Sequence, residues 1–308
     1  MRTWKTIALL LLAFGPASAD SPRSAPPPGA RPIHRALLIS VDGLRPDVLL
    51  RAKAPVLRDL MKRGSFTLWA VTTPAAVTLP SHTSMLTGVS PAKHGIDWNS
   101  DLPLAHPVYP AWPTLFELAR KAGLTTAMTA GKSKFSVLAK PGTLDWSFVP
   151  PTGPQSDSTV ADTAVAWIRR HSPQVLFVHL PGVDVAGHAR GWGSHEQLAA
   201  VAAADRCVGR LLAALRSRRL RDATVILVTA DHGGTGNGHG PDDPRSRYIP
   251  WIISGPGIRA DFDLTTIADL NVRTEDTFAT ICYLLEIPVP EPIDGRPVME
   301  ILDDSPGR

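Results

Sequence analysis

The sequence predicts an α/β protein, a three-layer αβα sandwich in which a mostly parallel sheet lies between two layers of helices. Two observations support this fold class: strand-like and helix-like segments alternate along the chain, and the strand-like segments are near-continuous apolar runs. Such runs are typical of strands that are covered on both faces. With 308 residues and a hydrophobic content of 44%, the chain can bury a large core. No repeat or change of composition marks a second domain, so we expect a single domain over residues 35–308.

Five segments carry the clearest strand pattern: residues 35–41, 125–130, 174–180, 223–230 and 248–254. Helices are predicted between them, in the segments 54–64, 113–123, 158–171, 195–219 and 274–286. In open α/β sheets of this kind, ligands bind at the C-terminal ends of the strands. The residues that follow each predicted strand are therefore the first place to look for a site.

The first 34 residues are expected to lie outside the folded domain. Basic residues precede the apolar run IALLLLAF, and a small-residue triplet ends at Ala19, which is typical of a signal peptide over residues 1–19 that is cut after Ala19. We therefore expect a secreted or periplasmic protein. The run is far shorter than the roughly 20 residues that span a bilayer, and no later segment is long enough to span one, so no membrane span is expected in the mature chain. Residues 20–34, rich in proline and small residues, indicate a flexible leader.

Charge and cysteine content restrict the partners only slightly. The formal net charge of +4 mildly favours anionic ligands. The basic run RSRRLR at residues 216–221 ends a predicted helix and has no interleaved aromatic residues, so a solvated helix end explains it better than a nucleic-acid-binding module. Cys207 and Cys282 both fall in predicted helices, where one disulfide or two buried thiols are possible. The oligomeric state is not indicated by the sequence.

Residue types that bind divalent metals follow three of the predicted strands and occupy one later loop. They are Asp42, Asp184, His188, Asp231, His232 and His239. Each has an ordinary explanation on its own, in a turn, a cap or the core. Together, carboxylates and imidazoles at the ends of apolar strands are costly to bury unless something neutralises them, and paired metal ions would do so. The sequence therefore predicts a metal site.

The spacing of these residues is compatible with such a site. Asp184 and His188 are four residues apart, so they face the same way if their segment is helical. Asp231 and His232 are adjacent and reach two different ions only from an irregular loop, which the glycines of DHGGTGNGHG permit.

Thr78 is the predicted nucleophile. Pro80 fits the first position of a helix, so the turn before it would bring the Thr78 hydroxyl to a helix N-terminus, where free N–H groups favour negative charge. A threonine hydroxyl is a weak nucleophile that metal coordination can activate. The alternative is a buried threonine that supports the turn. Beside the metal-binding residues, Thr78 indicates a two-metal hydrolase of phosphate esters.

Several motifs resemble those of the alkaline phosphatase superfamily, and within it the type I phosphodiesterase and nucleotide pyrophosphatase branch. They are SVDGLRPD (40–47), TLPSHTSMLTGVSPAKHGI (78–96), GVDVAGH (182–188), VTADHGG (228–234), GHG (238–240) and DGRPVMEIL (294–302). They occur in the family's order and span nearly all of residues 35–302. The resemblance implies an alkaline-phosphatase-like fold and hydrolysis of a small phosphorylated substrate through a phospho-threonine intermediate.

The resemblance also implies how two divalent metal ions are held. One would be bound by Asp42, Thr78, Asp231 and His232, and the other by Asp184, His188 and His239. Mixed Asp and His ligands suit Zn²⁺, with Mn²⁺ or Fe as alternatives.

The predicted substrate contacts surround Thr78. The backbone N–H of Leu79 is expected to meet a phosphoryl oxygen. Ser81 stands where the pyrophosphatase pattern has asparagine, and it is shorter. Lys132 and Lys134 follow a strand and share a face if their segment is extended. They resemble the Lys-x-Lys of phosphonoacetate hydrolase, although solvated lysines are an equal alternative. If they line the pocket, a monoester or phosphonate is favoured over a diester.

Aromatic and amide side chains near the motifs form a second group of candidates. Asn99, with Trp98 and Trp192, is expected either at the pocket rim or, for the tryptophans, in packing.

Other functions fit parts of this pattern. A phosphomonoesterase, a phosphonoacetate-hydrolase-like enzyme or a phosphotransferase would use the same residues. A sulfatase needs cysteine or serine at the position of Thr78 and favours calcium, whereas this set contains three histidines. A non-catalytic binding protein would be expected to lack some member of the set.

Overall fold

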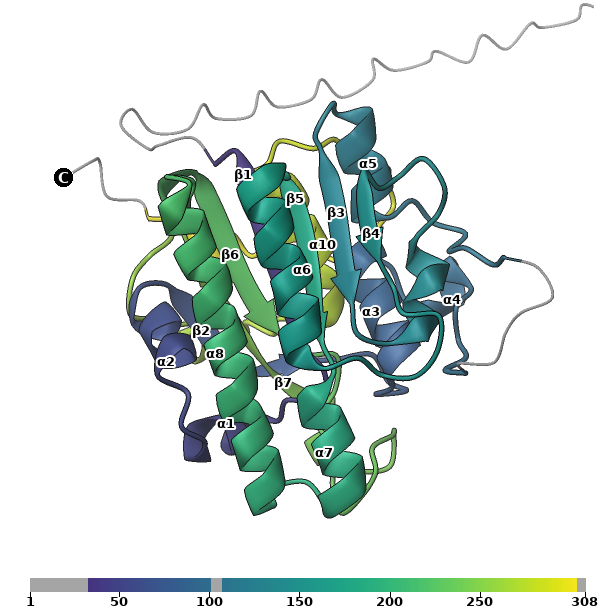
Figure 1. The fold of residues 1–308 in the computed structure, drawn as a ribbon, viewed down its shortest axis with the longest axis vertical. Helices are drawn as coiled ribbons and strands as arrows, with labels where there is room; N and C mark the ends of the chain where they lie inside the picture. Colours follow the sequence, from purple (N-terminus) through teal and green to yellow (C-terminus); the bar gives the residue numbers. More distant parts are fainter. Residues whose placement is uncertain (1–32, 101–106, 304–308) are drawn as a thin grey trace, which may run out of the picture.

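The computed structural model describes residues 33–100 and 107–303, which form a three-layer αβα sandwich around one eight-stranded sheet (Figure 1). The strands are β1 (Arg35–Val41), β2 (Ser65–Val71), β3 (Thr126–Ala130), β4 (Trp146–Phe148), β5 (Val175–Leu180), β6 (Thr224–Thr229), β7 (Tyr248–Ser254) and β8 (Phe262–Asp263). Their order in the sheet is β4-β3-β5-β1-β6-β7-β2-β8. Strand β7 is antiparallel to both of its neighbours, and the other pairs are parallel. The predicted fold class is confirmed. The signal peptide and most of the leader lie outside the described residues.

All five predicted strands are present, and their bounds agree with the predicted ones to within a residue. They form the centre of the sheet, where both faces are covered and a near-continuous apolar run is required. Strands β2, β4 and β8 are additional. Strand β2 lies towards one edge and alternates buried with less buried residues, and β4 and β8 have three and two residues, too few for a pattern to be recognised.

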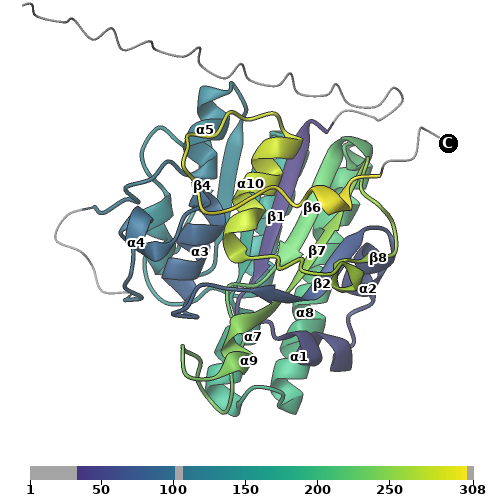
Figure 2. The ribbon, with the colours of Figure 1, turned by 180° about the vertical axis from the view of Figure 1, so that it is seen from behind.

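Helices cover both faces of the sheet. They are α1 (Pro46–Arg51), α2 (Pro55–Lys62), α3 (Thr78–Thr87), α4 (Pro91–His94), α5 (Leu115–Lys121), α6 (Asp157–Arg170), α7 (Gly182–Arg190), α8 (His195–Ser217), α9 (Pro244–Arg247) and α10 (Thr274–Leu284). Figure 1 shows α6 and α8 in front of the sheet, and Figure 2 shows α3 and α10 on the opposite face. The side chains of Thr114, Ser156 and Ser194 each accept a hydrogen bond from a backbone N–H in the first turn of α5, α6 and α8, which explains where these helices begin.

Helix α3 is unusual because every one of its residues is buried. Its hydroxyl groups are satisfied inside the protein: the side chains of Thr83 and Thr87 donate to the carbonyl oxygens four residues earlier, and Ser84 pairs with His94. The helix begins at Thr78, so Pro80 is its third residue and the prediction that Pro80 is the first was wrong. The first three N–H groups of a helix have no partner within it, and proline is tolerated at any of these positions for the same reason.

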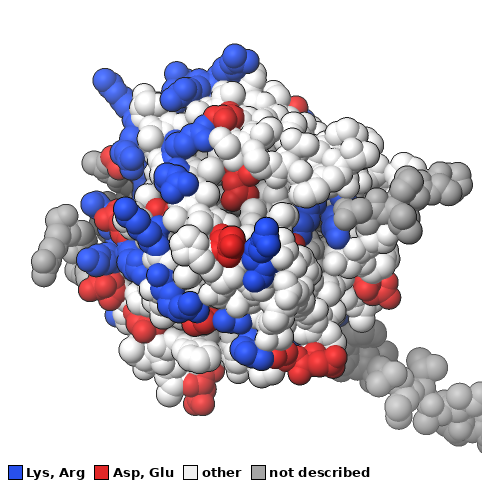
Figure 3. Space-filling view, turned by 60° about the horizontal axis from the view of Figure 1, so that its bottom comes forward, with Lys and Arg blue, Asp and Glu red and all other residues white. Residues whose placement is uncertain are grey.

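The carboxyl ends of β1, β5 and β6 lie together at one edge of the sheet, at the lower end of the molecule in Figure 1, where α7 begins. Figure 3 turns this end forward and shows Lys and Arg side chains gathered mainly on its left half, with Asp and Glu among them. A gathering of basic side chains favours the approach of anions.

Two expectations about covalent and membrane features can be compared with the structure. Cys207 and Cys282 are both buried free thiols, and burial raises the pKa of Cys207 to about 11, so neither is a reactive thiolate. None of the helices in the described ranges has the length and apolarity to cross a bilayer.

Asp157, the first residue of α6, connects this helix to the edge of the sheet described above. Its Oδ1 accepts a hydrogen bond from the backbone N–H of Gly182 at 2.8 Å, at the start of α7. A side chain at Gly182 would meet this carboxylate, because a Cβ there would lie 2.7 Å from Asp157 Oδ2. Burial, with a smaller effect of the charge of Asp42, raises the pKa of Asp157 to about 6.

We predict that Asp157→Asn makes the free energy of unfolding less dependent on pH. A carboxyl group with a raised pKa in the folded state stabilises the fold below its unfolded pKa, and this contribution is lost as the pH rises through about 6. The amide cannot ionise and still offers an oxygen to Gly182. Between about pH 4 and about pH 7, the stability of the variant relative to wild type should therefore rise by about 2 kcal/mol, most of the free energy of the raised pKa. Urea unfolding in the presence of a chelator measures this difference.

The matched control is Asp162→Asn, an exposed aspartate of the same helix whose side chain is 61% accessible. Its stability relative to wild type should not change with pH in this range. Parallel pH curves for the two variants would contradict the proposed effect of burial at Asp157.

Candidate active site

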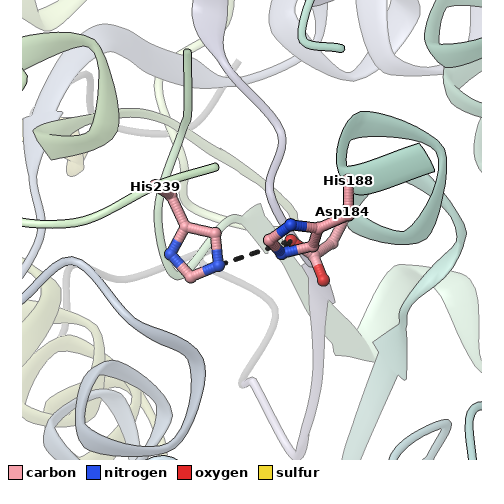
Figure 4. Close-up of side chains that lie close together, drawn as sticks. All are labelled: Asp184, His188 and His239. Atoms are coloured by element: carbon pink, nitrogen blue, oxygen red, sulfur yellow. Dashed lines mark ion pairs between the residues drawn. The ribbon is translucent and has the colours of Figure 1, made fainter. Parts of the chain in front are cut away.

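Three segments at the carboxyl ends of the strands bring the predicted metal ligands together: the loop after β1, helix α7 after β5, and the loop after β6. Asp184 and His188 lie one turn apart in α7, which is helical as their spacing required, and His239 comes from the loop after β6. The Nε2 atom of His188 lies 3.3 Å from Asp184 Oδ1, and that of His239 lies 3.8 Å from the same oxygen. Figure 4 shows the three side chains converging, and their ligand atoms lie within 4.8 Å of one another. They form the first ligand cluster.

The second ligand cluster is centred on His232 Nε2. This atom lies 3.4 Å from Asp42 Oδ1, 3.2 Å from Asp231 Oδ2 and 3.4 Å from the hydroxyl of Thr78. One ligand atom each of Asp42, Asp184 and His232 also lie within 4.8 Å of one another, so Asp184 is within reach of both clusters. The rings of His232 and His239 stack at 3.7 Å, which places the two clusters side by side.

The residues present fit divalent cations. Three carboxylate oxygens of the site, Asp42 Oδ1, Asp184 Oδ1 and Asp231 Oδ2, are buried and have no hydrogen-bond partner in the described part of the structure. Buried carboxylate oxygens without a partner are costly, and each of these faces at least one histidine nitrogen of the clusters. Burial lowers the pKa of His232 to about 4, so its imidazole is neutral at physiological pH, the form that binds metal.

The carboxyl groups differ in their electrostatic environment. Burial would raise the pKa of Asp42, but Lys132 and His179 outweigh it and hold the pKa well below its usual range. Burial and the negative charge of Asp42 would also raise the pKa of Asp184, but His188 and Lys132 outweigh them and lower it to about 2. For Asp231, burial and the charge of Asp42 prevail and raise the pKa well above its usual range. The site thus has more carboxylate than its lysine can neutralise, which is a further reason to expect bound cations.

The loop after β1 is held against the other ligand loops by its glycine. Gly43 has a φ of +73° and its N–H donates to Asp231 Oδ1 at 3.1 Å. A Cβ at this position would lie 3.0 Å from the backbone of Asp184, so a larger residue would push two ligands apart.

Lys132, a predicted substrate residue, lies among the predicted metal ligands. Its Nζ lies 2.7 Å from Asp42 Oδ2 and from Asp184 Oδ2, and 3.5 Å from the Thr78 hydroxyl. The expectation that Lys132 and Lys134 share one extended segment was wrong, because a 3₁₀ helix, η1 (Ser133–Leu138), begins between them. The two lysines therefore have different partners.

The other predicted substrate residues contact one another. Lys134 donates to the carbonyl oxygen and Oδ1 of Asn99, and this Oδ1 also accepts the N–H of Leu79 at 3.0 Å. In this structure the Leu79 N–H is thus engaged by Asn99, and a phosphoryl oxygen would have to replace that bond. The hydroxyl of Ser81 pairs with those of Thr72 and Thr73 and supports the loop before α3.

Two buried histidines were not assigned to the site from the sequence. His179 accepts the N–H of Gly131 at Nδ1, so its Nε2 carries the proton and donates it to Asp42 Oδ2 at 2.7 Å. His82 donates from Nδ1 to the carbonyl oxygen of Thr78 and accepts from Ser40 at Nε2. The sequence did contain one signal for His179: it is the only polar residue of an otherwise apolar strand and lies near the end of that strand.

Trp192 is buried, so the packing interpretation applies to it rather than the pocket rim. Its indole N–H donates to the carbonyl oxygen of Gly43 at 2.9 Å, and its ring lies against those of His188 and His239. A Cβ at Gly234 would lie 2.3 Å from the indole. The tryptophan thereby fixes the spacing of the loops that carry both ligand clusters.

The described residues adopt an alkaline-phosphatase-like α/β fold. Residues 36–243 match the family model described as type I phosphodiesterase / nucleotide pyrophosphatase, and the chain belongs to this family. The structure is similar to that of the murine ectonucleotide pyrophosphatase/phosphodiesterase 5, with a TM-score of 0.71 and 15% identity over 88% of this chain and 100% of that one. It is also similar to the phosphonate monoester hydrolase of Agrobacterium radiobacter, with a TM-score of 0.67 and 17% identity over 88% of this chain and 77% of that one. These two structures establish the shared fold.

Curated relatives agree with the family. An uncharacterized pyrophosphatase/phosphodiesterase of Schizosaccharomyces pombe is 25% identical over 64% of this chain and 44% of its own length. The GPI ethanolamine phosphate transferase 1 of Aspergillus fumigatus is 29% identical over 44% of this chain and 15% of its own length. The chain thus spans less than half the length of these curated relatives.

We predict that His179→Leu weakens metal binding. The variant removes the hydrogen bond that orients Asp42, and loss of such an outer partner typically costs about 10- to 100-fold in metal affinity. Calorimetric titration of the apo protein with Zn²⁺ or Co²⁺ measures the change. His171→Gln is the control. His171 lies directly after α6, before β5 begins, and its ring stacks on that of Trp146 in β4. Equal affinities of the two variants would show that His179 does not orient Asp42.

Proposed function

We propose that the protein is a metal-dependent phosphoester hydrolase of the phosphodiesterase/pyrophosphatase type that uses Thr78 as its nucleophile. The observation that carries the proposal is the place of the Thr78 hydroxyl. It lies at the start of α3, 3.4 Å from the nitrogen at the centre of the second ligand cluster and 3.5 Å from the ammonium group of Lys132. A nucleophile that attacks an anionic phosphate needs positive charge beside it, which Lys132 and an ion bound in the second ligand cluster would supply.

The two ligand clusters would each hold one divalent ion. Asp42, Thr78, Asp231 and His232 would bind one ion, and Asp184, His188 and His239 the other. The mixed donor set favours Zn²⁺, with Mn²⁺ or Fe as alternatives. Bound ions would supply Lewis acidity to the phosphoryl oxygens and to the attacking oxygens.

The reaction proceeds in two displacements at phosphorus. In the first, Thr78 Oγ1 attacks in line, the bond from phosphorus to the leaving oxygen breaks, and the hydroxyl proton ends on the released alcohol. In the second, water attacks the phospho-threonine, one proton of the water regenerates the Thr78 hydroxyl, and the product is released, a phosphate monoester from a diester or inorganic phosphate from a monoester. The N-terminus of α3 and Lys132 stabilise the negative charge that develops on the phosphoryl oxygens.

Two relatives support this reaction class. The murine structure is an inactive threonine-to-alanine variant in complex with AMP, which makes a threonine essential to that protein and a nucleotide its ligand. The second is a hydrolase of phosphonate monoesters. Both are phosphorus esters, and a small phosphorylated substrate is accordingly proposed for this chain.

Phosphoryl transfer to an alcohol is a second candidate, because one curated relative is an ethanolamine phosphate transferase. It would use the same first displacement, with an alcohol instead of water in the second. Phosphorus NMR of a reaction that contains glycerol distinguishes the two: hydrolysis yields inorganic phosphate and transfer yields glycerol phosphate.

Export is proposed from the N-terminal sequence alone. The apolar run and the small-residue triplet that ends at Ala19 support cleavage there and a secreted or periplasmic location. N-terminal sequencing of the secreted protein would test the cleavage position.

We predict that the zinc-loaded protein releases p-nitrophenol from p-nitrophenyl phosphate or bis-p-nitrophenyl phosphate faster than from p-nitrophenyl sulfate. Threonine cannot form the aldehyde residue of a sulfatase, and its hydroxyl suits attack at phosphorus. A dinucleotide extends the panel to natural esters. Turnover of the sulfate ester above every phosphate ester would refute the proposed function.

We predict that Thr78→Ala lowers kcat on the best phosphate ester by on the order of 10⁴- to 10⁶-fold, as expected for loss of a nucleophile. Thr78→Ser keeps a hydroxyl and should retain part of the activity. Mass spectrometry of acid-quenched wild-type enzyme should find phosphate on Thr78. An alanine variant with more than a tenth of the wild-type rate would rule out this residue as the nucleophile.

A further inference from the structure

We propose that Asn237 is a positioning residue that holds His188 in the orientation for metal binding, and that it sets the metal affinity of the first ligand cluster alone. The proposal rests on the metal binding that is part of the proposed function. It is carried by a reciprocal pair of hydrogen bonds between the two residues and by the exposure of His188.

His188 is the exposed member of the first ligand cluster. Its side chain is 46% accessible, whereas those of His239 and Asp184 are 8% and 4% accessible. The predicted ligands of the second cluster are all buried. Packing fixes a buried side chain, but a half-exposed imidazole can rotate into solvent unless a hydrogen bond holds it. The orientation of His188 therefore depends on its hydrogen-bond partner.

The partner of His188 lies in the loop that carries His239. The Nδ1 atom of His188 is 2.9 Å from the carbonyl oxygen of Asn237, and the side-chain Nδ2 of Asn237 donates to the carbonyl oxygen of His188 at 3.0 Å. A carbonyl oxygen only accepts, so Nδ1 carries a proton and Nε2 is the nitrogen left for a cation. This Nε2 is the atom that faces Asp184 Oδ1. The two bonds thus fix both the tautomer and the direction of the ring.

Asn237 lies at the tip of a tight hairpin. The backbone N–H groups of Thr235 and Gly238 donate to each other's carbonyl oxygen at 2.8 and 3.0 Å, and Gly236, the first residue of the turn between them, has a φ of +53°. The carbonyl oxygen of Gly236 also accepts the N–H of Trp192 at 2.7 Å. The hairpin thereby presents the carbonyl oxygen of Asn237 to α7, and the side chain of Asn237 ties the tip to that helix.

The fold of the hairpin does not need the side chain of Asn237. Its own backbone bonds close the hairpin, the bond to Trp192 is also between backbone groups, and Asn237 is exposed. Removal of this side chain should therefore leave the fold intact and release the tip from α7.

The other ligand histidines have partners of their own. The Nδ1 atom of His232 lies 2.8 Å from the carbonyl oxygen of Gly233, and that of His239 lies 2.9 Å from the carbonyl oxygen of Ala76. Neither bond involves the hairpin tip. Loss of the Asn237 side chain should thus affect His188 and the first cluster, and leave the second cluster unchanged.

The experiment is a calorimetric titration of the metal-free protein with Zn²⁺ in wild type and in Asn237→Ala. The affinity of the first cluster should fall by about tenfold in the variant, and that of the second should stay as in wild type. Tenfold is the lower end of the usual effect of an outer partner, because the variant keeps the backbone carbonyl group that accepts from His188.

Two further variants make the result specific. His188→Ala removes the ligand itself, so the binding step that it abolishes or weakens identifies the first cluster. Asn271→Ala is the matched control: this asparagine is also exposed and belongs to neither ligand cluster nor the hairpin, so both affinities should equal those of wild type. The midpoint of urea unfolding in the presence of a chelator should be the same in wild type and in both asparagine variants.

The absorption spectrum of bound Co²⁺ distinguishes positioning from support of the fold. Visible absorption of Co²⁺ depends on the geometry of its ligands, so the band that His188→Ala removes should change in Asn237→Ala and remain as in wild type in Asn271→Ala. A residue that only supported the fold would move the unfolding midpoint and leave this band unchanged.

Different outcomes separate this inference from the proposed function. A wild type that binds no Zn²⁺ contradicts the proposed function, and the inference with it. If wild type binds Zn²⁺ and Asn237→Ala changes no affinity, lowers all of them alike, or lowers the one that His188→Ala leaves intact, the inference is overturned and the proposed function stands.

Discussion

The site depends on the charge balance among three buried carboxylates. Asp42, Asp184 and Asp231 end up at one edge of an apolar sheet, where an unpaired charge costs several kcal/mol even after relaxation. Lys132 forms ion pairs with two of them but supplies only one positive charge, and the raised pKa of Asp231 reflects the carboxylate charge that is left over. Because cations would supply the missing compensation, metal binding is linked to the stability of these loops.

Glycine residues in the backbone around the carboxylates let the loops approach one another closely. Gly43 brings the loop after β1 into contact with α7, and Gly234 leaves space for the indole of Trp192. This indole donates to Gly43 and packs against two ligand histidines, so one buried side chain fixes three loops at once. Close packing of uncharged groups, the glycine backbone and the Trp192 indole, therefore fixes the relative positions of the loops that carry the charged side chains.

The sequence was sufficient for the central strands and for the Asp and His residues that gather at their carboxyl ends, because both depend on local signals. A strand covered on both faces is apolar throughout, and a charged residue directly after such a strand is easily recognised. The partners of Lys132, Asn99 and His179 could not be obtained in this way. They depend on where η1 bends the chain and on which loops meet across the sheet, and neither property is encoded in a pattern of a few residues.

The two ligand clusters are coupled to each other through shared groups. Asp184 is within reach of both, Lys132 joins Asp184 to Asp42, and the stacked rings of His232 and His239 fill the space between them. A shift of either cluster would therefore move a ligand of the other. Thr78 contacts His232 and Lys132, one group from the second cluster and one that bridges both. The environment of the hydroxyl is thus set by both clusters together, as the proposed in-line displacement at phosphorus would require.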